Sequence, residues 1–264
     1  MYPVICLEML FPELDLPEKV ERIASEGFQA VEFWGWRDKD LFVLKAACDH
    51  HGVRIANFSG HRRGSLIAPE TYDLFFTDLN DAVGTARNLG CSILMLLSNE
   101  LGEGGRVVNS YPDIPPDGKY RNLRQGLEQA LEVTPEDIHL VLEPLNTRLD
   151  HPGYYLENMA TAVSLIREVD HPRLKVLCDL YHLGMMGENL EKIIAEQIEY
   201  IGYFHAADFP GRHEPGSGSA DWPSLLRQIA QSGYEGMVGF EYSPESDSVK
   251  SLRRIWNIWE ESVG

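Results

Sequence analysis

The clearest structural signal in this 264-residue chain comes from four apolar runs, His139-Leu140-Val141-Leu142-Glu143, Leu174-Lys175-Val176-Leu177-Cys178-Asp179, Ile201-Gly202-Tyr203-Phe204-His205 and Met237-Val238-Gly239-Phe240-Glu241. Short apolar runs between helical segments are typical of buried parallel strands. Each run ends on a carboxylate or an imidazole, side chains that bind hard or borderline metal ions. The pattern therefore predicts four consecutive strands that each end on a candidate ligand.

The same alternation of strand and helix extends over the whole chain. The other predicted strands span 2–7, 30–33, 53–58 and 92–97, and the predicted helices span 15–26, 39–51, 69–89, 121–132, 156–169, 190–197, 222–232 and 246–261. Eight strand–helix units in strict alternation imply parallel strands with right-handed crossovers. A (β/α)8 barrel takes roughly 250 residues, and no linker divides this chain. We predict an α/β fold, a single (β/α)8 TIM barrel over residues 1–264, with its active site at the C-terminal ends of the strands.

Charge and composition limit the classes of partner. The formal net charge is −18, so a nucleic-acid backbone or an anionic membrane surface would be repelled. No apolar run approaches the roughly 18 residues of a membrane-spanning helix, and the N-terminus lacks a basic and then apolar signal segment. The four cysteines lack C-x-x-C spacing and are typical of small buried hydrophobes in a reducing compartment. We expect a cytoplasmic protein that binds neither nucleic acid nor membranes.

The four strand ends supply a candidate metal centre. The C-terminal strand ends of a (β/α)8 barrel meet at one mouth, so ligands far apart in sequence could share one ion. The candidates are Glu143, Asp179, His205 and Glu241. Three carboxylates suit Mg²⁺ or Mn²⁺, and one imidazole also admits Co²⁺ or Zn²⁺. Many proteins end strands in acids, so a purely structural role stays open on spacing alone.

Two of these residues, Glu143 and Glu241, come from well-separated strands and could flank a bound substrate. One carboxylate would take a proton from a carbon next to a carbonyl, and the ion would stabilise the developing enediolate as a Lewis acid. Return of the proton to the neighbouring carbon gives isomerisation. Return to the other face of the same carbon gives epimerisation. His182 and Arg212 are the candidates for holding substrate oxygens.

Three long irregular stretches, 59–68, 98–119 and 208–220, follow predicted strands and should surround the same mouth. Long loops inside a compact domain are usually functional. Arg212 lies in the third stretch, where a solvated surface position is the simpler interpretation of the residue on its own. Trp34 and Trp36 flank a glycine after a predicted strand, and they could form a stacking wall for a sugar or pack at the rim.

Motifs along nearly the whole chain resemble the hydroxypyruvate isomerase branch of the xylose isomerase-like superfamily of sugar isomerases and epimerases. They are Met9-Leu10-Phe11, Gly27-Phe28-Gln29-Ala30-Val31-Glu32-Phe33, Glu143-Pro144-Leu145-Asn146-Thr147-Arg148, Pro152-Gly153-Tyr154-Tyr155-Leu156 and, most specific, Pro210-Gly211-Arg212-His213-Glu214-Pro215-Gly216-Ser217-Gly218. The resemblance implies a TIM barrel with one divalent ion, usually Mn²⁺, Mg²⁺ or Co²⁺, held by the four strand-end residues. It also implies Glu143 and Glu241 as the acid–base pair, His182 and Arg212 as substrate contacts, and a homodimer or homotetramer.

Departures from that branch bear on the substrate. Hydroxypyruvate isomerases usually carry Gln at the position of His205, where sugar 3-epimerases carry His. Ser219 follows the loop glycine where Glu is usual, and the stretch 59–66 differs from the loop expected for so small a substrate. These differences favour a larger polyol or keto sugar. The rivals are an inosose-dehydratase-like lyase on the same scaffold, a non-catalytic sugar-binding protein and, disfavoured by the acidic charge, a DNA-repair endonuclease.

Overall fold

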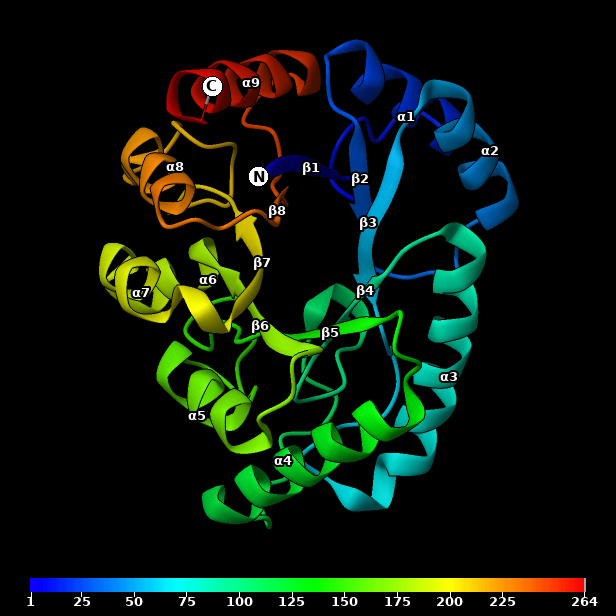
Figure 1. Ribbon diagram of the computed structural model, residues 1–264, viewed down its shortest axis with the longest axis vertical. Helices are drawn as coiled ribbons and strands as arrows, with labels where there is room; N and C mark the ends of the chain where they lie inside the picture. The colour runs from blue at the N-terminus through cyan, green and yellow to red at the C-terminus, as the bar shows by residue number, and fades with distance from the viewer. Residues whose placement is uncertain (264) are drawn as a thin grey trace.

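The computed structural model describes residues 1–263, and within them eight parallel strands form a closed barrel in the order of the sequence (Figure 1). The strands are β1 Tyr2–Cys6, β2 Ala30–Phe33, β3 Arg54–Ser59, β4 Ile93–Leu96, β5 His139–Leu142, β6 Leu174–Asp179, β7 Ile201–Ala206 and β8 Met237–Phe240. The last strand pairs with the first, with Met237 opposite Tyr2 and Phe240 opposite Ile5, which closes the barrel. The predicted (β/α)8 fold is confirmed.

Helices surround this barrel, as Figure 1 shows. They are α1 Leu16–Ser25, α2 Leu41–His51, α3 Tyr72–Leu89, α4 Pro116–Val133, α5 Met159–Val169, α6 Leu180–Met186, α7 Leu190–Gln197, α8 Trp222–Gln231 and α9 Ser248–Val263, with short 3₁₀ turns η1 Pro69–Thr71, η2 Glu103–Gly105 and η3 Ile198–Tyr200. The largest differences from the sequence prediction concern two of them. Helix α4 begins at Pro116 rather than at 121, because proline is well tolerated in the first helical turn. Helix α6, which follows β6 directly, was not predicted.

Local signals fix where the helices begin and end. Asp15 caps α1 through the backbone N–H of Glu18, and the Glu18 side chain accepts from the Asp15 N–H, so both form a capping box. Helix α2 ends at Gly52, whose φ of 68° is left-handed and favours glycine. These caps set the entry and exit of the helices that pack on the strands.

A compact layer of side chains fills the interior of the barrel. It receives one residue from each of seven strands: Val4, Ala30, Ala56, Met95, Val141, Leu177 and Tyr203. A larger apolar cluster fills the space between the strands and the helices. The interior is therefore a packed core rather than a pore, as in other (β/α)8 barrels, and a ligand has to bind beyond the strand ends.

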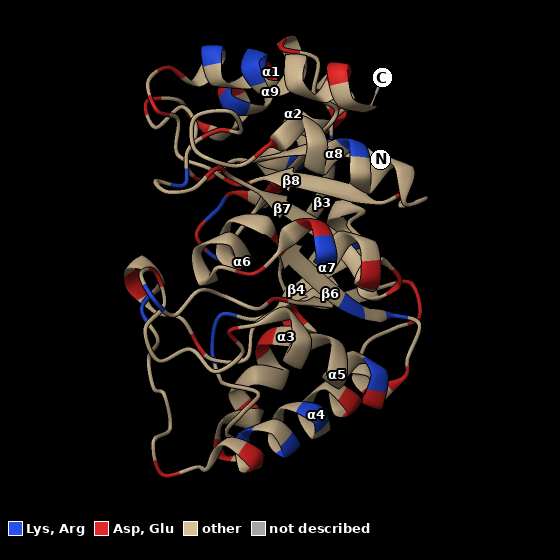
Figure 2. Ribbon diagram, turned by 90° about the vertical axis from the view of Figure 1, so that its left-hand side faces the viewer, with Lys and Arg blue, Asp and Glu red and all other residues tan. Residues whose placement is uncertain are grey.

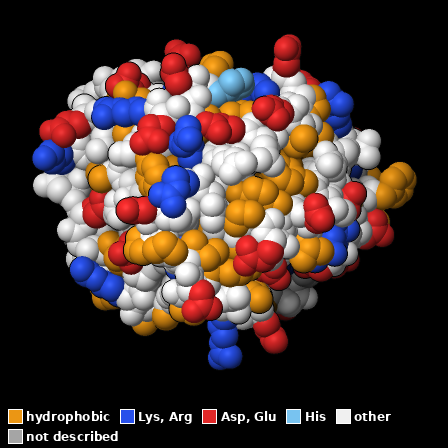
Figure 3. Space-filling model, turned by 90° about the horizontal axis from the view of Figure 1, so that it is seen from below, with side chains coloured by type: hydrophobic (Ala, Val, Ile, Leu, Met, Phe, Trp, Pro, Cys, Tyr) orange, Lys and Arg blue, Asp and Glu red, His pale blue; other side chains and the backbone are white. Residues whose placement is uncertain are grey.

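The long loops lie at the end of the barrel where the strands finish, opposite the chain termini (Figure 2). The loop after β3 is tied to α3, because buried Asp78 accepts the backbone N–H groups of Arg62 at 2.9 Å and Arg63 at 3.0 Å. The loop after β7 folds around buried Asp208, which accepts from Gly216 N at 2.8 Å. On the face seen in Figure 3, basic side chains are scattered among acidic and apolar ones. Among residues 1–263, no helix combines the length and apolar character that a membrane crossing requires.

Candidate metal centre

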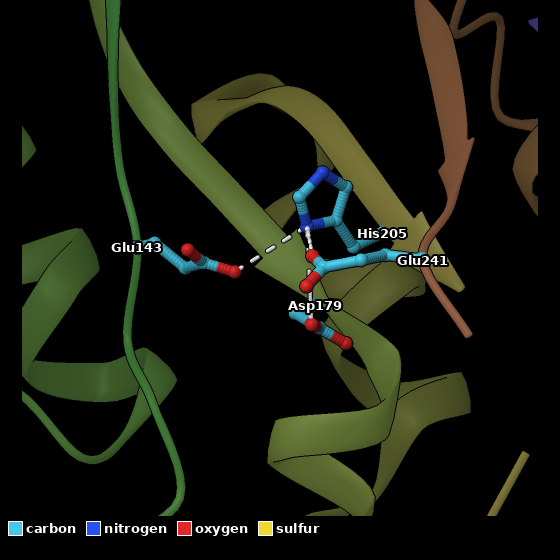
Figure 4. Close-up of side chains that lie close together, drawn as sticks. All are labelled: Glu143, Asp179, His205 and Glu241. Carbon is cyan, nitrogen blue, oxygen red and sulfur yellow. Dashed lines mark ion pairs between the residues drawn. The ribbon is translucent and has the colours of Figure 1, made fainter. Parts of the chain in front are cut away.

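The four predicted ligands meet at the mouth of the barrel. Glu143 follows β5 directly, Asp179 ends β6, His205 lies in β7, and Glu241 follows β8. Each offers one ligand atom, these atoms all lie within 4.8 Å of one another, and all four residues are buried. Figure 4 shows the side chains converging from their separate strands. Neighbouring parallel strands bring their carboxyl ends to the same rim, so consecutive strand ends can form one cluster.

The imidazole of His205 lies at the centre of three carboxylates. Its Nδ1 is 3.0 Å from Glu241 Oε2, 3.4 Å from Glu143 Oε1 and 3.9 Å from Asp179 Oδ2. None of these contacts satisfies Nδ1 with a well-formed hydrogen bond. Three buried carboxylates repel one another unless a cation lies among them. One nitrogen and three oxygens fit a divalent ion such as Mn²⁺, Mg²⁺ or Co²⁺.

The two glutamates of the cluster differ in their proton affinity. Burial, together with the charges of Asp179 and Glu241, raises the pKa of Glu143 to about 7. Burial also acts to raise the pKa of Glu241, but the Arg212 guanidinium, the nearby His205 imidazole and the hydrogen bond from Trp34 outweigh it and lower that pKa to about 2. At neutral pH one carboxylate can therefore exchange a proton while the other stays ionised.

Arg212 is held beside Glu241 rather than in solvent. The loop after β7 gives this residue a φ of 56°, and its Nη2 donates to Glu241 Oε1 at 2.7 Å. The guanidinium also lies over the ring of Tyr181, 5.1 Å from its centroid. Its Nε is buried and has no hydrogen-bond partner within residues 1–263. The structure thus places a cation with a free donor against one ligand of the centre.

His182 lies on α6, the helix that the sequence did not reveal. Asp179 caps this helix by accepting from the backbone N–H of Tyr181 at 2.8 Å, which turns His182 toward the cluster. His182 Nδ1 is 2.7 Å from Asn146 Nδ2, a donor, so the ring proton is assigned to Nε2, 3.5 Å from Asp179 Oδ2. Burial and nearby Arg212 lower the pKa of His182 well below its usual range, and the ring is neutral.

A cavity of about 640 Å³ opens onto the cluster, and two of the four predicted ligands line it. Glu143 and Glu241 line it together with His182 and Arg212, whereas Asp179 and His205 do not. Trp34 also lines it and donates from Nε1 to Glu241 Oε1 at 2.9 Å. Trp36 is buried and tilted against Phe58, so of the two tryptophans considered from the sequence only Trp34 forms part of the wall.

Several cavity residues had not been identified from the sequence: Arg62, Glu100, Asp150 and His151. They come from the loops that follow β3, β4 and β5, whose mutual packing no local pattern encodes. His151, for example, joins two loops through its Nδ1, 2.7 Å from the carbonyl oxygen of Gly105. Glu32 was also missed; it lies on β2 and contacts the far side of His205 at 3.3 Å. A charged residue inside an otherwise apolar predicted strand was the available signal for it.

Metal binding is expected to weaken as the pH falls through about 7. Glu143 keeps a proton below that pH in the ion-free protein, and His205 is also protonated because the surrounding carboxylates outweigh its burial and raise its pKa. A divalent ion must displace these protons, so its apparent affinity should drop about tenfold per pH unit for each proton displaced.

Calorimetric titration with Mn²⁺ in two buffers of different ionisation enthalpy would count the protons released on binding. Glu103→Gln, at the cavity wall, serves as the control. An affinity that is constant from about pH 6 to about pH 8 would contradict this expectation.

Comparison with known proteins places the chain in a family. The family model for the xylose isomerase-like TIM barrel matches residues 20–258. The hydroxypyruvate isomerase of Escherichia coli K12 is 30% identical, over 94% of this chain and 95% of the relative. A structure titled AP endonuclease, family 2, from Brucella melitensis superimposes with a TM-score of 0.87 at 26% identity, covering 97% of this chain and 98% of that one. A D-psicose 3-epimerase from Clostridium cellulolyticum H10 shares the fold at 19% identity, with a TM-score of 0.75 and coverage of 100% and 96%.

The family match spans most of the chain, and the isomerase relative is aligned over nearly its whole length. Both agree with the resemblance found in the sequence motifs. The chain belongs to the xylose isomerase-like TIM-barrel family, in its hydroxypyruvate isomerase-like branch.

Proposed function

We propose that this protein is a divalent-metal-dependent isomerase or epimerase that moves a proton on a small sugar or hydroxy-keto substrate through an enediolate. The observation that carries the proposal is the division of the four ligands by the cavity. Glu143 and Glu241 line it from β5 and β8, while Asp179 and His205 lie behind them. Two ligands can therefore reach a substrate, and two serve only to hold the ion.

The four cluster residues would hold the ion, which when bound supplies a Lewis acid for the oxygens of the reacting carbons. Glu241, which Arg212 and Trp34 keep ionised, accepts the proton from the carbon next to the carbonyl. The same carboxylate, or Glu143 from its own strand, returns a proton to the substrate. Return to the neighbouring carbon gives isomerisation, and return to the opposite face of the same carbon gives epimerisation.

The remaining cavity groups orient the substrate. Arg212 lines the cavity beside Glu241, and we assign its guanidinium to a substrate oxygen. His182 is neutral, and its Nε2–H supplies a second donor near the centre. The indole face of Trp34 offers an apolar wall for carbon-bound hydrogens. Holding the substrate in one orientation decides which carbon presents its hydrogen to a glutamate.

The cavity favours a polyol or keto sugar larger than hydroxypyruvate. Its volume of about 640 Å³ extends beyond the cluster to the loops after β3 and β4, where Arg62 and Glu100 supply polar groups. Relatives carry the names hydroxypyruvate isomerase and, for one from Haemophilus influenzae at 26% identity, 2-oxo-tetronate isomerase. An endonuclease activity is disfavoured, because a net charge of −18 and the wall residues Glu100, Glu103 and Asp150 would repel a phosphate backbone.

Isotope exchange tests the proposal. Protein stripped of metal and reloaded with Mg²⁺ would be incubated in D₂O with hydroxypyruvate, keto sugars, aldoses and inososes. NMR would then follow the incorporation of deuterium into each substrate. We expect deuterium at a carbon next to a carbonyl, reduced about 10²–10⁴-fold in Glu143→Gln and Glu241→Gln. Glu136→Gln, which changes an exposed carboxylate outside the cavity wall, should exchange normally. Loss of water from an inosose would favour the lyase, and metal binding without any exchange would favour a binding protein.

Arg212→Lys is expected to lower kcat/KM about 10–100-fold on the substrate found in that screen, because lysine lacks the planar array of donors with which arginine can bind Glu241 and the substrate in a fixed geometry. Steady-state kinetics at saturating metal would measure it, with Arg148→Lys as the control, since Arg148 is an exposed arginine outside the cavity wall. Equal kinetics in the two variants would show that Arg212 does not contact the substrate.

A further inference from the structure

A buried carboxylate outside the cluster, Glu32 on β2, contacts the side of His205 that faces away from the other ligands. Glu32 is 3% exposed. His205 Nε2 lies 3.3 Å from each oxygen of this carboxylate, whereas Nδ1 faces Glu143 and Glu241. The two nitrogens of the imidazole are therefore assigned to different neighbours, one to Glu32 and one to the cluster.

Tyr203 holds the Glu32 carboxylate from the same strand as His205. Its Oη donates to Glu32 Oε2 at 2.7 Å, and its ring lies edge-on to His205 with centroids 5.5 Å apart. Tyr203 and His205 are two residues apart on β7, so both side chains point into the barrel. The carboxylate is thus fixed relative to the imidazole by a neighbour on the same strand.

Gly239 on β8 makes this contact sterically feasible. Strands β8 and β1 lie between β7 and β2 in the barrel, and Gly239 is the register partner of His205. A Cβ added at Gly239 would collide with the Glu32 carboxylate. Gly239 is not among the glycines with positive φ, so the requirement here is for space rather than for a left-handed backbone. The missing side chain lets Glu32 reach across β8 to His205.

We propose that Glu32 is a positioning residue for the metal centre, which accepts the Nε2–H of His205 and so directs the lone pair of Nδ1 at the ion. The inference rests on the proposed function, because it requires that the cluster binds a metal. A neutral imidazole has one N–H and one lone pair, so an acceptor fixed at Nε2 selects the tautomer that can ligate through Nδ1. Carboxylates in this position orient the ring and strengthen it as a ligand.

A purely structural role explains the presence of this carboxylate less well than the positioning role does. Tyr203 satisfies Oε2, but Oε1 is buried with no well-formed hydrogen bond among the described residues. A buried, partly satisfied anion is costly, and an apolar side chain would fill the same space without that cost. The cost is offset when His205, its neighbour, is protonated or binds a cation.

The test uses full-length protein stripped of metal. Glu32→Gln keeps the shape and removes the charge, and we expect it to weaken Mn²⁺ binding about 10–100-fold in calorimetry and to change the visible spectrum of bound Co²⁺. Gly239→Ala, which displaces the carboxylate, should have a similar effect, and the double variant should be no worse than either single one. The control is Glu188→Gln, a partly buried carboxylate that accepts from Met159 N and should bind normally.

The outcomes separate this inference from the proposed function. Unchanged Mn²⁺ affinity and Co²⁺ spectrum in folded Glu32→Gln would overturn the role of Glu32 and leave the metal centre intact. Absence of metal binding in the wild-type protein would overturn the proposed function, and this inference with it. If Glu32→Gln fails to fold, Tyr203→Phe decides the question, since it should weaken Mn²⁺ binding in the same direction by a smaller factor and an unchanged affinity would overturn the role.

Discussion

The structure depends on the convergence of three buried carboxylates around His205. Burial and mutual repulsion make such a group unstable unless a positive charge lies within it, and the distances of 3.0, 3.4 and 3.9 Å from Nδ1 show how closely the oxygens approach. A parallel barrel can hold this arrangement because its hydrogen-bonded strands fix the positions of the strand ends. The rest of the mouth is organised around that cluster, with Arg212 and Trp34 on one side and His182 on another.

The same convergence creates the chemical difference between two glutamates. Arg212 and Trp34 both contact Glu241, whereas Glu143 has no comparable donors within residues 1–263 and its pKa rises to about 7. In the ion-free protein, Glu143 therefore binds a proton more tightly than Glu241 does. The loop after β7 contributes to this difference directly, because its fold around Asp208 is what brings Arg212 to the centre.

Much of the fold and of the metal centre could be predicted because each depends on short-range patterns. The apolar runs indicated where the strands end, and parallel strands place their ends together, so spacing and barrel geometry predicted that the four side chains meet. Their role as metal ligands was an expectation from the family resemblance. Helix α6 could not be predicted because it is short, contains Gly184 and follows Asp179 directly, without a separating loop. The role of Glu32 could not be predicted because its partner His205 is 173 residues away. The space at Gly239 that lets the two side chains meet exists only in the closed barrel. His151 and Asp150 depend on the packing of long loops.

Anomalous diffraction from crystals soaked in Mn²⁺ tests the central claim most directly. The account predicts one strong peak at the mouth of the barrel, within about 2.0–2.6 Å of an atom from each of Glu143, Asp179, His205 and Glu241. In that density His205 should bind through Nδ1, with Nε2 directed at Glu32. A map with no peak among these residues, or with the ion bound elsewhere while the four side chains stay apart, would contradict the account.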